Sequence, residues 1–234
     1  MARTSYGSLH SLIYSVLSAP LAILQGSLFT YMFLMLVSSV LWFVGIHGGM
    51  VVSPFMYMIY MQPALNNAAA FAAGQSLPHL LTIGALNILL LGGIGNTLGL
   101  TIVMALRGKS AKMKTLGRLS VLPGISGINE PIVFGFPLIL NPIMAIPFIL
   151  VPQINIVLMY LTLKMGLVGY PRVPDLPLGT PVLLDGFLQS GFGAVVLQIA
   201  LIALSALIYY PFFAIEDKKA YALEQSTHDN TIGA

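Results

Sequence analysis

A single acidic residue stands out as the first candidate for chemistry. Glu130 is the only acidic residue between Met1 and Arg172, and it lies inside an apolar segment next to Asn129. A carboxylate at membrane depth is costly unless it is paired or hydrated, so such a residue is a functional candidate by default. A cap at a helix start is compatible with this role, because acids favour helix N-termini and Pro131 suits a first helical turn. Whether Glu130 acts as a base or only as a hydrogen-bond acceptor stays open.

His47 is the second candidate and lies in the sequence GIHGG. The flanking glycines Gly45, Gly48 and Gly49 let the backbone turn and let a ligand approach closely. An interfacial histidine in contact with headgroup water is the alternative, and we favour the functional interpretation. His79, which follows Pro78, is expected at the end of a hairpin.

Several other kinds of site are excluded or weakly supported. The chain contains no Cys, and its four His residues lack the spacing of metal ligands, so we predict no metal and no cofactor. The run GGIGNTLG, Gly92 to Gly99, has no preceding strand and lacks the Lys of a phosphate-binding loop. We expect it to pack helices closely through small residues. No arrangement of Ser, His and acid supports a hydrolase.

The elements that must position these residues are membrane segments. The 234 residues are 57% hydrophobic and only 7% charged, which is too few charges to cover a water-facing surface. Ten Lys and Arg against seven Asp and Glu leave a net charge of +3, too little for nucleic-acid binding. With 23 Gly and 15 Pro, the spans cannot all be simple straight helices. The composition therefore predicts an all-α integral membrane protein with interrupted spans.

Four apolar stretches are long enough to cross a bilayer, which needs about 20 apolar residues of helix. The third contains three prolines, so we expect about four to five transmembrane helices. The last ends in aromatic residues that suit a membrane–water interface. The four stretches are Ser27 to Ile46, Thr82 to Leu106, Leu138 to Leu163 and Phe187 to Phe213.

Two further segments are apolar but too broken to cross. They are Met50 to His79 and Leu122 to Pro137, and the second contains Glu130. Irregular backbone at membrane depth is tolerated only where it is buried in protein or lines a watery cavity. We therefore predict two re-entrant hairpins beside a pathway.

The remaining segments set the domain boundaries. Serines alternate with apolar residues at helical spacing near the N-terminus, which predicts an amphipathic surface helix over residues 1–26 and not a cleaved signal peptide. Residues 27–215 form the transmembrane domain, and residues 216–234 form a loose cytoplasmic tail. The basic residues from Arg107 to Arg118 occupy one short loop, which the positive-inside rule places in the cytoplasm together with both termini.

The segment around Glu130 resembles a known family. GINEPIVFGFPLILNPIMAIPFILVPQIN, Gly127 to Asn155, is similar to the signature region of the lactose/cellobiose-type (diacetylchitobiose-like) IIC sugar permeases of the bacterial phosphotransferase system. LWFVGIHG, GGIGNTLGL and LIYYPFFAIEDK agree with the same family. The likeness covers nearly the whole chain and corresponds to the C-terminal half of these permeases. One departure is LPLGTP, Leu176 to Pro181, where the family has a tryptophan-containing loop.

The resemblance implies a function. Members take up a β-linked disaccharide or glycoside, such as cellobiose, lactose or diacetylchitobiose, through the bacterial cell membrane. A partner IIB component, which carries a phosphocysteine, phosphorylates the sugar at its 6-hydroxyl. His47 and Glu130 would then coordinate the sugar near that hydroxyl, with Asn129 helping to hold it. Partners implied are the glycoside, phospho-IIB, the lipid bilayer, and either a separate scaffold half or a homodimer partner.

Two other functions stay open from the sequence. The chain is either a permease component or a truncated, non-transporting remnant or accessory subunit that pairs with another permease chain. A channel or proton-coupled transporter in which Glu130 relays protons is less favoured, since no second ionisable residue lies nearby in the sequence. Whether the chain has an enzymatic role is uncertain, because the phosphoryl donor belongs to the partner.

Overall fold

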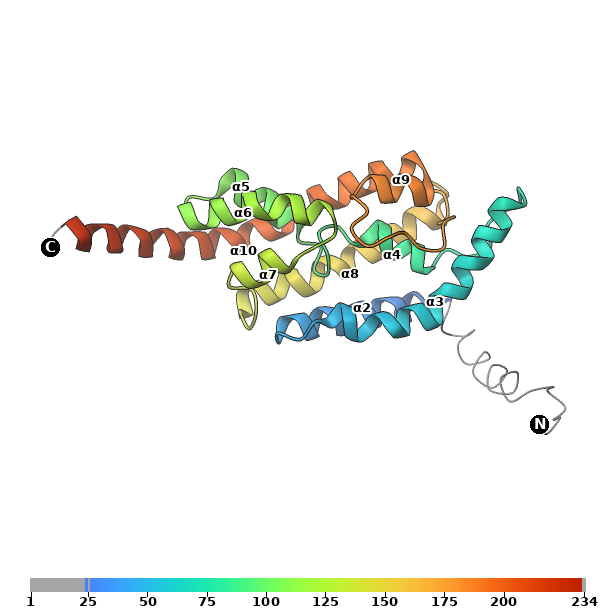
Figure 1. Cartoon of the computed structure of the whole chain (residues 1–234), viewed down its shortest axis with the longest axis horizontal. Helices are drawn as coiled ribbons and strands as arrows, with labels where there is room; N and C mark the ends of the chain where they lie inside the picture. Colours follow the sequence, from blue (N-terminus) through green and yellow to red (C-terminus); the bar gives the residue numbers. More distant parts are fainter. Residues whose placement is uncertain (1–23, 25, 233–234) are drawn as a thin grey trace, which may run out of the picture.

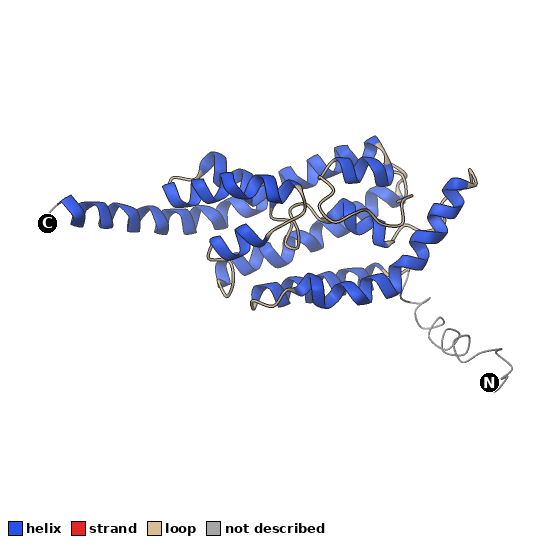
Figure 2. Cartoon of the chain, in the orientation of Figure 1, coloured by secondary structure: helices blue, strands red, loops and turns tan. Residues whose placement is uncertain are grey.

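The protein is helical throughout the part that the structure describes. The computed structural model describes Leu24 and residues 26–232, with side chains through Ser226. Helices α2 to α10 account for the regular structure there, and no strand occurs among these residues (Figure 2). This confirms the prediction of an all-α protein. The surface helix predicted over residues 1–26 falls almost entirely outside the described residues.

Helices α2 and α3 form an antiparallel pair along one side of the molecule (Figure 1). Helix α2 spans Leu28–Phe43 and begins at Ser27, whose hydroxyl accepts a hydrogen bond from the Thr30 amide. Helix α3 spans Gly48–Ala72 and contains two prolines. The rings of Tyr31 and Tyr60 meet edge to face at 4.9 Å between the two helices.

The segment predicted as the first hairpin is a helix with an extended return. It comprises most of α3 and the non-helical chain that follows, and not two short helices. Asn67 joins the two arms: its Nδ2 donates to the carbonyl of His79 at 2.7 Å, and its Oδ1 accepts from the amide of His79 at 3.0 Å. His79 therefore lies on the returning arm, as expected.

The structure divides the predicted span from Thr82 to Leu106 into two short helices. Helix α4 covers Ile83–Leu89, helix α5 covers Leu98–Arg107, and the chain between them is irregular. Positive φ angles at Gly92, Gly93, Gly95 and Asn96 prevent a continuous helix. Asn96 and Thr97 stabilise this loop from within, through bonds to the carbonyls of Leu89 and Gly92. We name residues 90–97 the glycine loop.

The segment predicted as the second hairpin, Leu122 to Pro137, contains the last turn of one helix, a tight turn and a short second helix. Helix α6 spans Ala111–Ile125 and helix α7 spans Glu130–Gly135. The basic residues expected in one short loop lie instead at the end of α5, in a three-residue turn, and on α6. That change follows from Ser110, whose hydroxyl caps the start of α6 by accepting from the Met113 amide.

Two long helices complete the molecule. Helix α8 spans Pro142–Lys164, a seven-residue helix α9 covers Leu184–Ser190, and α10 spans Phe192–Ile232. Helix α8 and the part of α10 from Phe192 to Ser226 are long and apolar enough to cross a membrane, judged by length and composition. In place of the loose tail expected after Glu216, α10 simply continues to Ile232.

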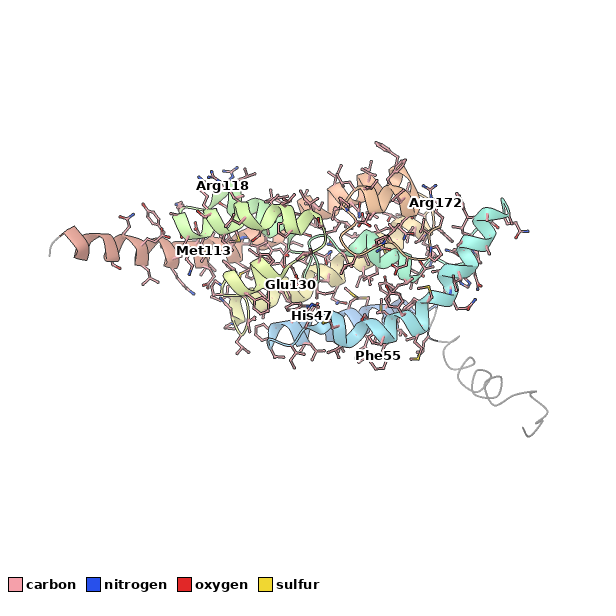
Figure 3. All side chains as sticks on the ribbon, viewed as in Figure 1. His47, Phe55, Met113, Arg118, Glu130 and Arg172 are labelled. Carbon is pink, nitrogen blue, oxygen red and sulfur yellow. The ribbon has the colours of Figure 1, made fainter. Side chains whose placement is uncertain are left out.

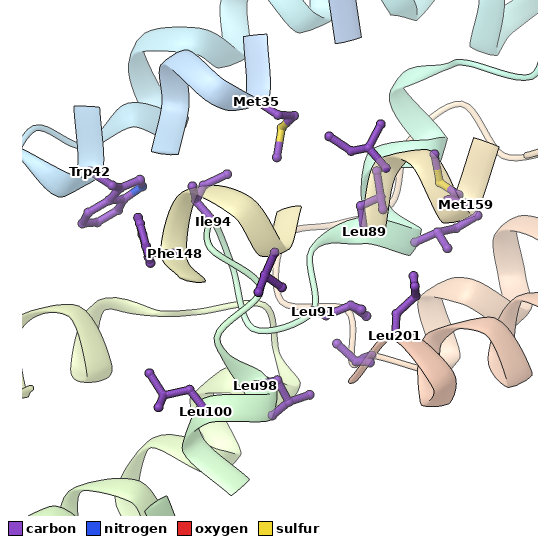
Figure 4. Close-up of a cluster of buried hydrophobic side chains, with 14 of the residues drawn as sticks. Met35, Trp42, Leu89, Leu91, Ile94, Leu98, Leu100, Phe148, Met159 and Leu201 are labelled. Atoms are coloured by element: carbon purple, nitrogen blue, oxygen red, sulfur yellow. The ribbon is translucent and has the colours of Figure 1, made fainter. Parts of the chain in front are cut away.

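The buried core gathers around the glycine loop. Leu91 and Ile94 of this loop point into a cluster that also contains Trp42 of α2, Phe148 of α8 and Leu98 of α5 (Figure 4). Helix α8 packs against both α2 and α10. The glycine loop is therefore enclosed by helices. It lies beside His47 and Glu130, because Ile94 of the loop is close to Gly49 and bonds to Asn129.

Candidate functional site

The two candidate residues are brought together by the fold. The Nε2 atom of His47 lies 3.4 Å from Oε1 of Glu130, although the two residues are 83 positions apart. Figure 3 shows His47 beneath Glu130, between the ribbons of α3 and α7. Their side chains are 40% and 43% exposed, so a small molecule can reach both. The structure thus places the two side chains next to each other, and their functional roles stay predictions.

His47 is oriented by the helix that it starts. It is the N-cap of α3, and its Nδ1 accepts a hydrogen bond from the Met50 amide at 3.1 Å. Since Nδ1 accepts, the hydrogen of a neutral imidazole ring stands on Nε2, which faces Glu130. His47 therefore presents a donor toward the carboxylate. The 3.4 Å separation is long for this bond and leaves room for a hydroxyl to exchange into it.

Trp42 supports the imidazole ring from behind. Its ring centroid is 4.3 Å from that of His47, and it also meets the ring of Phe134 at 6.1 Å. Trp42 is buried, and its indole N–H has no hydrogen-bond partner. Sequence analysis missed this role. The available signal was that Trp42 is the only tryptophan and precedes His47 by five residues.

A glycine next to His47 sets the distance between α2 and α3. A Cβ atom at Gly48 would stand 1.9 Å from the carbonyl oxygen of Ser38 on α2. Only a residue without a side chain fits this contact. By contrast, a Cβ at Gly49 would meet the His47 ring at 3.4 Å, which is ordinary contact. The two neighbouring glycines therefore differ in purpose, and Gly48 fixes the start of α3 against α2.

Asn129 holds Glu130 in place through the glycine loop. The Asn129 side chain is buried, and its Nδ2 donates to the carbonyl of Ile94 at 2.7 Å. The loop approaches so closely that a Cβ at Gly93 would stand 2.8 Å from Cγ of Asn129. The amide nitrogen of Asn129 is thus already engaged by the protein. Its role as a sugar ligand stays a prediction, and its observed contact is structural.

Several other polar residues have protein partners away from the pair. Nδ2 of Asn96 donates to the carbonyl of Leu89, and Nδ2 of Asn155 donates to the Ser205 hydroxyl. These two asparagines therefore satisfy neighbouring polar groups of the protein. The remaining partners are Gln189 for Asn87, Asn66 for His79, Tyr57 for Asp175 and Gln198 for Asp185.

The site has the chemistry of a receptor for hydroxyl groups. Among the described residues, no group of three or more His, Asp or Glu side chains is arranged to hold a metal ion. What His47 and Glu130 offer is one donor and one charged acceptor, half-exposed and side by side. A neutral ligand with adjacent hydroxyls can bind both at once, because each hydroxyl donates and accepts.

Comparisons with known proteins show the family of the chain. Residues 4–152 match the family model described as "Phosphotransferase system, EIIC". The lichenan permease IIC component of Bacillus subtilis (strain 168) is 39% identical over 92% of this chain and 48% of its own length. The cellobiose-specific EIIC component of Geobacillus stearothermophilus is 37% identical over 100% of this chain and 53% of its own.

A solved structure shows the same fold. The crystal structure of the transporter ChbC, the IIC component of the N,N′-diacetylchitobiose-specific phosphotransferase system, matches with a TM-score of 0.90 and 39% identity. The match covers 95% of this chain and 52% of that one. The chain thus spans about half the length of the relatives it matches. EIIC components are integral membrane proteins, and the chain belongs to the EIIC family of the phosphotransferase system.

Proposed function

We propose that this chain is the sugar-binding, C-terminal half of an EIIC permease for a β-linked disaccharide or glycoside. The observation that carries the proposal is the His47–Glu130 pair, which places a donor and a charged acceptor 3.4 Å apart at a half-exposed position. The relatives named for cellobiose, lichenan and N,N′-diacetylchitobiose support a β-linked ligand. The LPLGTP departure leaves the choice among these sugars open.

Binding follows from the orientation of the two groups. A sugar hydroxyl donates its hydrogen to the carboxylate of Glu130, and its oxygen, or that of its neighbour, accepts from Nε2 of His47. Hydrogen bonds that involve a charged acceptor are about twice as strong as neutral ones, which favours a ligand that itself carries no charge. The Met50 amide and the Trp42 ring hold the imidazole before the sugar arrives. Little ordering of the site is then needed on binding.

The printed sequence contains no cysteine that could carry the phosphate, and we therefore propose a phosphate-carrying partner. We propose that the partner is a phospho-IIB component that carries a phosphocysteine. The oxygen of the sugar 6-hydroxyl attacks phosphorus, the phosphorus–sulfur bond breaks, and the thiolate leaves on IIB. The hydroxyl proton passes to Glu130, the acceptor nearest to it. The negative charge of Glu130 makes the attacking oxygen a better nucleophile as this proton leaves.

The arrangement in the membrane completes the proposal. Residues 27–215 form the transport domain in the bacterial cell membrane, and the chain after residue 215 is a cytoplasmic segment. The basic residues of α5 and α6 and the C-terminal part of α10 lie at the same end of the molecule, as expected if both face the cytoplasm (Figure 1). A scaffold half or a homodimer partner covers part of the exposed apolar surface, and lipid covers the rest.

The sole tryptophan allows a direct test of sugar binding. Cellobiose is titrated into the purified chain in detergent while Trp42 fluorescence is recorded, with calorimetry as a second measurement. We expect Glu130→Gln to weaken binding at least tenfold, because the amide has lost the charge and one acceptor. Asp175→Asn is the matched control, since Asp175 contacts Tyr57 and not the pair. Equal affinities for the wild type and Glu130→Gln would refute the proposed role of Glu130.

A further inference from the structure

The end of the molecule formed by the α5–α6 turn carries a concentration of positive charge. Arg107 ends α5, Lys109 lies in the turn, and three more basic residues follow on α6. Lys218 on α10 lies at the same end, next to Asp217, whose carboxylate reaches this turn. We name this set the basic surface; it comprises Arg107, Lys109, Lys112, Lys114, Arg118 and Lys218.

The described acidic residues Asp217 and Glu224 bind backbone groups of the turn and form no ion pair with the basic surface, although the charge of Glu224 interacts with that of Lys112. Asp217 accepts hydrogen bonds from the backbone amides of Lys109 and Ser110 at 2.8 and 3.1 Å. Glu224 accepts from the amides of Ala111 and Lys112 and from the Ser110 hydroxyl. Both carboxylates are thus used to satisfy the start of α6.

The third acid on α10 with a described side chain, Glu216, pairs with Lys219 at 2.7 Å. Among the described side chains, no charged side-chain nitrogen of the basic surface lies within 4.0 Å of a carboxylate oxygen. Arg107, Lys109, Lys112, Arg118 and Lys218 are exposed, and Lys114 is half-buried. The surface therefore presents several cations that form no ion pair with a carboxylate. Asp217 and Glu224 attach the turn that carries these cations to α10.

Large apolar side chains continue from the basic surface along α6. Lys112, Leu119 and Leu122 are exposed and lie along one face of the helix, since they are spaced by seven and three residues. Leu119 and Leu122 are 69% and 74% exposed, and Leu106 beside Arg107 is 72% exposed. At a rise of about 1.5 Å per residue, this face passes from cations to leucines within about 15 Å. This order of charged and then apolar side chains matches the change from lipid headgroups to acyl chains across a membrane surface.

We propose that the basic surface binds the phosphate groups of anionic phospholipids, while the leucines of α6 contact the acyl chains of the same lipids. The binding fixes the depth of the α6–α7 hairpin, whose far end carries Glu130. An anionic lipid fits better than an acidic protein because the cations are followed at once by exposed leucines and not by further polar groups. Figure 3 shows Arg118 on the outer edge of the molecule, away from His47 and Glu130.

Lipid binding is tested by native mass spectrometry of the purified chain with phosphatidylglycerol or phosphatidylcholine as the probe. We expect preferential retention of phosphatidylglycerol, which weakens at high salt. The double variant Lys112→Gln/Arg118→Gln should bind it about 25-fold more weakly, since each Lys or Arg near an anionic surface contributes about fivefold, or about 1 kcal/mol. Lys164→Gln is the control, because Lys164 ends α8 at the end of the molecule away from the basic surface (Figure 1). This variant should bind phosphatidylglycerol as the wild type does.

One further double variant and one further measurement separate the effect of charge from effects on folding and on sugar binding. Lys112→Arg/Arg118→Lys keeps both charges and should retain the lipid, whereas loss in this variant would contradict a charge-based site. Cellobiose binding in detergent should be unchanged in all these variants, so failure of the lipid proposal is distinguishable from failure of the proposed function. Equal retention of both lipids, or binding that depends on an acidic protein and not on phosphatidylglycerol, would overturn the proposal.

Discussion

His47 and Glu130 both stand at helix starts, but His47 is fixed by its own helix whereas Glu130 is fixed by a distant segment. Nδ1 of His47 caps α3 by binding the amide three residues ahead. Helix α7 receives no such cap, because the side chain of Asn129 binds the glycine loop instead. One half of the site therefore follows from local sequence, and the other half depends on a contact between residues 35 positions apart.

This difference matters for how the site can change. A locally capped residue keeps its orientation as long as its helix forms, whereas Glu130 follows any movement of the glycine loop. The loop is itself enclosed by Phe148 and Leu98, so close that a Cβ at Gly95 or Gly92 would collide with them. We therefore expect mutations in the glycine loop to change the position of Glu130 although the loop does not contain it. Mutations at His47 should have two separable effects, one on the cap of α3 and one on ligand binding.

The largest effect is expected at the contact between α2 and α3. Gly48→Ala would place a Cβ 1.9 Å from the Ser38 carbonyl, so the two helix backbones must separate. We expect a loss of about 3 kcal/mol in stability, the upper part of the range for overpacking, together with loss of glycoside binding. Thermal unfolding in detergent measures the first, and Trp42 fluorescence measures the second.

Gly49→Ala serves as the control for this prediction. Its Cβ would make only ordinary contacts with His47 and Ile94, at 3.4 to 3.7 Å. We expect a change in stability below about 1 kcal/mol, because the residue lies inside a helix where alanine is favoured over glycine. If Gly48→Ala were as stable as Gly49→Ala, close approach of the helices would not be what fixes His47.

A smaller effect is expected where the glycine loop meets Asn129. Gly93 has a φ of +76°, and a Cβ there would stand 2.8 Å from Cγ of Asn129. Gly93→Ala should cost about 2 kcal/mol, from backbone strain and from the lost bond to Ile94. It should also weaken sugar binding, as Glu130 moves. Gly74 also has a positive φ, but a Cβ there would meet no atom within 4 Å. Gly74→Ala should therefore lower stability and leave sugar binding unchanged.

The smallest effect separates the two roles of His47. His47→Asn retains a side chain that can cap α3, whereas His47→Ala does not, so the asparagine variant should be about 1 kcal/mol more stable. Both variants lose the donor that faces Glu130, and both should therefore bind cellobiose weakly. Calorimetric titration and thermal unfolding test the two statements separately. Normal sugar binding by His47→Asn would show that the imidazole acts only as a cap.

The sequence was informative where a local rule applied. Glu130 stood out because an acid in an apolar segment is rare, and His47 because of its flanking glycines. The helix over Leu138 to Leu163 was confirmed, since α8 spans Pro142–Lys164 with prolines inside it. The helix boundaries at Ser110 and Ser126 were missed, so the basic residues were placed in a loop although most of them lie on α6.

Other features escaped because their cause lies far away in the chain. The stretch from Thr82 to Leu106 has the composition of a spanning helix, and nothing local predicts that it divides at the glycine loop. The tail after Glu216 is polar, yet α10 continues because Asp217 and Glu224 bind the start of α6 more than 100 residues earlier. Trp42 was overlooked for the same reason: its contact with the His47 ring exists only once α2 and α3 are packed.

What the sequence by itself determined is the class of protein and the identity of its two unusual polar residues, because composition and burial cost depend on residue type alone. The tertiary structure decided that these residues face each other, which groups are already engaged, and which remain available to a ligand. The physical reason is that a hydrogen bond or a close contact depends on distance in space. Between His47 and Glu130 that distance is set by α2, the glycine loop and Asn129 acting together.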